Sequence, residues 1–86
     1  MALTFDIVTP AGARLRETAV ERVVVRRRES DHDPGSEVAI YPRHGALLMQ
    51  TQASVARLTR NGLTQELPVG AGVLEVFRDH VTLVET

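Results

Sequence analysis

The tripeptide Asp31-His32-Asp33 is the densest group of side chains able to hold a metal ion. Its carboxylate oxygens and imidazole nitrogens are ligands that divalent cations accept, and His44 or His80 could add a further nitrogen. A cation site needs three or four ligands that converge on one point, whereas the side chains of one tripeptide spread apart. The pattern therefore favours a solvated loop, and we predict no metal site.

Two further groups suggest chemistry that the rest of the sequence does not support. The run Arg26-Arg27-Arg28 could bind phosphates, but acidic residues follow at once, the net charge is −1, and only three aromatic residues could stack on bases. A hydrolytic pairing of Ser30, Ser36 or Ser54 with His44 lacks a Gly-x-Ser-x-Gly turn, and no Gly-rich phosphate loop is present. We predict no nucleic-acid binding, no catalytic residue, no cofactor, and a protein that is not an enzyme.

The stretch 35–48 joins a short strand to a break and is the best candidate for a contact surface. The run Val38-Ala39-Ile40-Tyr41 has strand character, and Pro42 ends it because proline has no N–H to donate. His44 and Gly45 then lie where the chain changes direction, a position that often carries contacts. The residues alone favour a buried, hydrogen-bonded corner histidine at His44 over a partner contact.

Short strands must position these residues, because no segment carries a 3.6-residue apolar stripe long enough for a helix. The polar residues 26–35 read as a surface loop. Alternation and β-branched density predict strands at 3–7, 14–16, 20–25, 73–77 and 81–84, with turns at 9–12 and 78–80 and a bend at 70–72. Many short strands predict an all-β sandwich or barrel in a single domain, residues 1–86.

Asn61-Gly62 predicts a two-residue hairpin turn between strands at 55–59 and 63–69, because both residues tolerate positive φ. A register shift of one residue would separate the polar pairs, so the sequence specifies the register. The predicted pairs on one face are Thr59 with Thr64 and Arg57 with Glu66.

Composition limits the class of protein. The 86 residues are 43% hydrophobic, which is ordinary for one small globular domain, and the absence of cysteine excludes disulfides and thiolate metal sites. No apolar run approaches the roughly 18 residues of a membrane span. The first residues lack a basic start and an apolar signal core, so the expected location is the cytoplasm.

Four segments together carry a resemblance to a known family. They are residues 3–10, 37–44, 70–76 and 80–84, in an order and spacing that resemble the epsilon subunit of F-type rotary ATP synthases over essentially the whole chain. The most specific element is a Gly-Ile-x-Pro-Gly-His-Ala-Pro-Leu type signature, which here reads Ala39-Ile40-Tyr41-Pro42-Arg43-His44-Gly45-Ala46-Leu47.

The resemblance implies both a fold and a role. The fold is an all-β, two-sheet antiparallel β-sandwich of about ten short strands, corresponding to the family's N-terminal domain. The role is that of a non-catalytic central-stalk subunit that couples gamma to the membrane c-ring, at the cytoplasmic face of the inner (plasma) membrane, while other subunits make ATP. By position, the implied c-ring contacts are Ser36, Glu37 and Val38, and the implied gamma contacts are Tyr41, Pro42, Arg43 and His44.

Several residues depart from the family pattern. Ala39 and Arg43 stand where the family usually has Gly, and Gly45-Ala46 replaces Ala-Pro, so a corner that needs positive φ must be rebuilt or the partner surface must differ. The loop at 26–35 is longer and more charged than usual. The sequence to Thr86 has no counterpart of the family's C-terminal helical hairpin, as expected for a naturally short subunit or a truncation. The alternative function is a small β-sandwich module that binds a ligand or divalent cation through residues 31–33.

Overall fold

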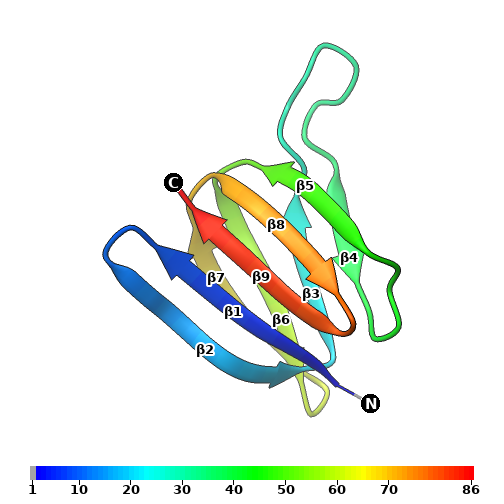
Figure 1. Cartoon of the computed structure of the whole chain (residues 1–86). Coiled ribbons are helices and arrows are strands. Elements are labelled where there is room, and N and C mark those ends of the chain that lie inside the picture. Colours follow the sequence, from blue (N-terminus) through cyan, green and yellow to red (C-terminus); the bar gives the residue numbers. More distant parts are fainter. Residues whose placement is uncertain (1) are drawn as a thin grey trace.

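Strands account for all the regular structure in residues 2–86, the part of the chain that this computed structural model describes (Figure 1). A five-stranded sheet has the order β2-β1-β9-β8-β5, and a four-stranded sheet has the order β4-β3-β6-β7. The nine strands are β1 (Leu3–Thr9), β2 (Gly12–Val20), β3 (Arg22–Arg26), β4 (Glu37–Ile40), β5 (Leu47–Thr51), β6 (Ser54–Arg60), β7 (Leu63–Val69), β8 (Gly72–Phe77) and β9 (His80–Glu85). The prediction of an all-β fold with two sheets is confirmed.

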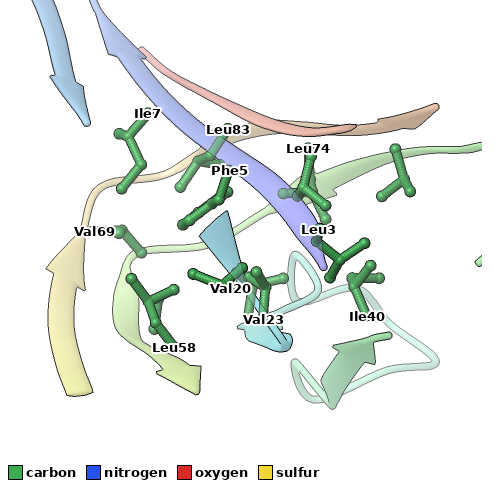
Figure 2. Packing of buried hydrophobic residues seen from close by; sticks show 14 of the residues in the cluster. Leu3, Phe5, Ile7, Val20, Val23, Ile40, Leu58, Val69, Leu74 and Leu83 are labelled. Carbon is green, nitrogen blue, oxygen red and sulfur yellow. The ribbon is translucent and has the colours of Figure 1, made fainter. Parts of the chain in front are cut away.

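The core lies between the two sheets and follows from the period of two along each strand. In β1 the side chains of Leu3, Phe5 and Ile7 are fully buried, while the residues between them face outward. Figure 2 shows Phe5 and Ile7 facing Leu58 and Val69 from the four-stranded sheet, while Leu3 lies near Ile40 of the same sheet. Neither sheet could exclude water from its apolar face alone, so burial of this shared layer holds the sheets together.

The β6–β7 hairpin confirms the register predicted from its turn. Asn61 and Gly62 both have positive φ, +50° and +76°, as a type I′ turn requires. Thr59 pairs with Thr64 and Arg57 with Glu66, and the two threonine hydroxyls lie 3.3 Å apart.

The strand directions differ from the expectation at one place. β1 and β9 pair in parallel, while every other pair of strands along residues 2–86 is antiparallel. The nine strands of the described residues agree with the expected number of about ten. Turn residues indicate only which strands that are consecutive in the sequence form hairpins. About 70 residues of chain separate β1 from β9, so no local pattern indicates their pairing or direction.

The predicted strands at 14–16 and 20–25 have the wrong bounds. β2 is a long edge strand that ends at Val20, and β3 begins at Arg22 in the other sheet. Between them the chain crosses from one sheet to the other at Glu21, whose N–H donates to the Thr59 carbonyl at 2.7 Å. Val20 and Val23 are both buried although their strands belong to different sheets, so the pattern of buried valines does not reveal the crossing.

Candidate functional site

The contact residues implied by the resemblance lie at the two ends of β4. The strand connects the loop at 27–36, which projects from the sandwich, to a corner at 41–46 that leads into β5 (Figure 1). Four residues of strand separate the two ends by roughly 10–13 Å. The structure therefore separates the implied c-ring contacts from the implied gamma contacts and joins them by one short strand.

Asp33 organises the loop end of β4. Its Oδ1 accepts the backbone N–H groups of Gly35 and Ser36, each at 2.8 Å, and its Oδ2 lies 3.0 Å from the Ser36 hydroxyl. These backbone N–H donors, with Arg27 nearby, hold the pKa of Asp33 below its usual value. The Asp33 carboxylate thus stabilises the turn that precedes β4.

The tripeptide at 31–33 does not assemble a cation site. Asp31 and His32 are exposed, and Asp33 is occupied by the turn. Across residues 2–86 no three histidine, aspartate or glutamate side chains converge in a way that could hold a metal ion. The alternative function of cation binding therefore gains no support from the geometry.

Glu37 is exposed but already paired. Its Oε2 lies 2.6 Å from Nη1 of Arg57, which reaches it across β3, and this hydrogen bond lowers the pKa of Glu37 and raises that of Arg57. Arg57 lies opposite Glu66 in the ladder, as predicted, but its ion pair is with Glu37. A cationic partner of Glu37 must therefore compete with Arg57.

Only two of the three implied c-ring contacts face the solvent. Ser36 and Glu37 are exposed, whereas Val38 is half-buried and packs against the core. Alternation along the strand explains the difference, because Val38 faces inward where Glu37 faces outward.

The corner at the other end of β4 is a surface turn. Pro42 lies two residues after β4 ends at Ile40, and the His44 N–H donates to the Tyr41 carbonyl at 3.2 Å. Tyr41 is 53% exposed and Arg43 is exposed, while Pro42 and His44 are half-buried. The implied gamma contacts thus come together on one turn, and two of them, Tyr41 and Arg43, are exposed.

His44 is held within the corner itself. Its Nδ1 lies 2.7 Å from the Gly45 carbonyl, so the ring is oriented by a local hydrogen bond. The hydrogen bond agrees with the corner histidine that the residues alone favour, but the side chain is half-buried rather than buried, and its exposed part leaves a surface for contact.

Arg43 keeps a backbone conformation that suits glycine. Its φ is +66°, so the corner is not rebuilt although the family's glycine is absent. The Arg43 N–H donates to Oδ1 of Asp79 at 2.6 Å. The carboxylate of the β8–β9 turn therefore fixes the corner.

Sequence reasoning missed the β8–β9 turn as part of this surface. Phe77 is 54% exposed, and the Arg78 guanidinium lies over its ring, 5.1 Å from the centroid. Arg78 and Asp79 both have positive φ, which makes a tight two-residue turn. The contact with the corner joins residues 36 positions apart, so no local pattern could have indicated it.

The part of the chain that the structure describes contains no helix of the length and apolar character needed to cross a membrane.

Several curated proteins that share one name are similar in sequence to this chain over more than nine-tenths of its length. It is 32% identical over 82 residues to the ATP synthase epsilon chain of Bacillus licheniformis, covering 95% of this chain and 57% of that protein. It is also 32% identical over 79 residues to the ATP synthase epsilon chain of Bacillus subtilis, covering 92% of this chain and 54% of that protein. The chain thus spans a little over half the length of these relatives. No family model matches it.

The fold is similar to that of a chain in a solved structure. In the mitochondrial ATP synthase of Euglena gracilis, an assembly of OSCP, F1 and c-ring in rotational state 1, one chain superposes with a TM-score of 0.81 at 12% identity. The match covers 98% of this chain and 50% of that chain.

Proposed function

This chain belongs by sequence to the ATP synthase epsilon chain family, and on that premise we propose that it is a non-catalytic rotor subunit of an F-type ATP synthase. Its role is to couple the gamma subunit to the membrane c-ring during ATP synthesis or hydrolysis, with catalysis in other subunits. The observation that supports this role best is sequence similarity over more than nine-tenths of the chain, together with a matching β-sandwich. The subunit would lie at the cytoplasmic face of the membrane, held there through the complex.

The two ends of β4 supply the proposed contacts. Ser36 and Glu37, with Val38 behind them, face the c-ring, and the corner of Tyr41, Pro42, Arg43 and His44 faces gamma. β4 is hydrogen-bonded along its length to β3, which is itself bonded to β6. A force applied at one contact therefore reaches the other through a sheet rather than through a flexible loop.

Binding to gamma tests the proposal. The gamma subunit of the same organism should bind this chain with a dissociation constant at or below the micromolar range, measured by isothermal titration calorimetry. Arg43→Glu should weaken binding at least tenfold, because it reverses a charge on the corner. Arg16→Glu is the matched control, since Arg16 is exposed on β2 at the opposite edge of the five-stranded sheet. Absence of any gamma complex would rule out the proposed function.

A further inference from the structure

Part of the edge that β5 forms in the five-stranded sheet is already paired with another segment of this chain, residues 26–28. β5 is an edge strand, yet the Arg28 N–H donates to the Gln50 carbonyl at 2.9 Å and the Gln52 N–H donates to the Arg26 carbonyl at 3.1 Å. The continuation of β3 thus pairs with the second half of β5 as an added strand. The first half of β5 has no such neighbour among residues 2–86.

Alternation along β5 places the backbone of Leu48 at this edge. Because Gln50 and Gln52 direct their backbone groups away from β8, the N–H and carbonyl of Leu48 point to the same side. Met49 points the other way, towards its partner Leu74 on β8. We call the outward side of residues 46–49 the β5 edge.

An apolar depression accompanies the β5 edge. Leu48 is 73% exposed and Phe77 is 54% exposed, and both line an open depression of about 270 Å³. The rest of its lining is apolar except for Glu75. Arg78 covers one face of the Phe77 ring. Unpaired backbone groups beside exposed apolar side chains are the two features by which sheets recognise an extended peptide.

We propose that the β5 edge receives an extended segment of the gamma subunit as an added strand, with one apolar side chain of that segment in the Leu48–Phe77 depression. The inference rests on the proposed function and adds a mode of binding to it. The β5 edge begins two residues after His44, so one partner surface can reach both it and the corner. Residues 26–28 stop the added strand at the other end, which leaves room for about three to four extended residues, roughly 10–13 Å.

Amide hydrogen exchange of the wild-type chain, followed by NMR with and without gamma, tests this mode. The Leu48 amide should exchange at least tenfold more slowly in the complex, because it gains a backbone acceptor. The Met49 amide, directed at β8 in the free chain, should change far less and serves as the internal control.

Substitutions separate the backbone bond from the apolar contact. Leu48→Ala removes the side chain and keeps the donor, whereas Leu48→Pro removes both, and proline is tolerated where an edge N–H faces outward. Gamma should bind Leu48→Pro at least tenfold more weakly than Leu48→Ala.

Three outcomes would overturn the inference in different ways. A gamma complex with unchanged Leu48 exchange would refute the added strand and leave the proposed function standing. Absence of any gamma complex would remove the proposed function and this inference with it. Protection of Leu48 in a dimer of this chain without gamma would identify a second copy as the occupant.

Discussion

Arg43 occupies a turn position that glycine would adopt more easily, and the side chain of Asp79 stabilises it there. A residue with a Cβ atom costs about 1–2 kcal/mol in the left-handed region that Arg43 occupies. Asp79 accepts the Arg43 N–H from a turn that is itself left-handed at two residues, and aspartate is among the residues that tolerate this conformation. The corner and the β8–β9 turn therefore depend on one another.

Removing the Asp79 acceptor should loosen the corner. Asp79→Ala should lower the free energy of unfolding by about 1–2 kcal/mol, because the Arg43 N–H loses its partner and alanine is strained at φ +63°. Asp79→Asn keeps an acceptor and a residue suited to this φ, so it should cost well under half as much. Urea unfolding at neutral pH measures both. Equal stabilities of Asp79→Ala and the wild type would show that the hydrogen bond does not hold the corner.

At the scale of elements, local chemistry was predictable and long-range pairing was not. The Asn61-Gly62 turn determines its own hairpin register, because every pair in it follows by counting from the turn. The β1–β9 pairing, the crossing at Glu21 and the Arg43–Asp79 contact depend on strands that are distant in the sequence. The position of the proposed gamma contacts on a corner was predictable from Pro42, but the β5 edge required the sheet order.

Three glycine substitutions should separate steric crowding from backbone strain. Gly72→Ala should cost about 2–4 kcal/mol, because its Cβ would lie 2.0 Å from the Val84 carbonyl oxygen in the β8–β9 ladder. Gly62→Ala should cost about 1 kcal/mol, because the site is open but φ is +76°. Gly45→Ala has neither problem and is the control. Thermal unfolding that ranked Gly62→Ala above Gly72→Ala in cost would contradict the packing between β8 and β9.

At the scale of the whole molecule, one buried carboxylate joins three strands from both sheets. Glu85 on β9 is 8% exposed, and its Oε1 lies 2.6 Å from Nη1 of Arg14 on β2. Its Oε2 accepts the Gly70 N–H at the end of β7, and Nη2 of Arg14 donates to the Pro68 carbonyl at 2.9 Å. The ion pair thus ties the edge of one sheet to the edge of the other, at the side of the sandwich where β2 faces β7.

This linkage gives the stability of the sandwich a defined pH dependence. Burial alone would raise the pKa of Glu85, but the Gly70 N–H and the Arg14 guanidinium outweigh it, so the pKa in the folded state lies below 4.5. The unfolded chain then binds more protons than the folded chain. The contribution of Glu85 is therefore complete above the unfolded pKa and is lost as the pH falls through the folded pKa.

Glu85→Gln should accordingly lower the free energy of unfolding by about 1–3 kcal/mol at pH 7, because a buried charge-assisted bond is replaced by a neutral one. The difference from the wild type should shrink once the pH falls below about 4.5, as the wild-type carboxyl group takes up its proton. Urea unfolding from pH 7 to pH 3 measures this difference. Glu75→Gln, on the exposed face of β8, should change stability by less than about 0.5 kcal/mol throughout. If the loss of unfolding free energy in Glu85→Gln stayed constant down to pH 3, the shape of the side chain, and not the charge of the carboxylate, would be what holds the two sheets together.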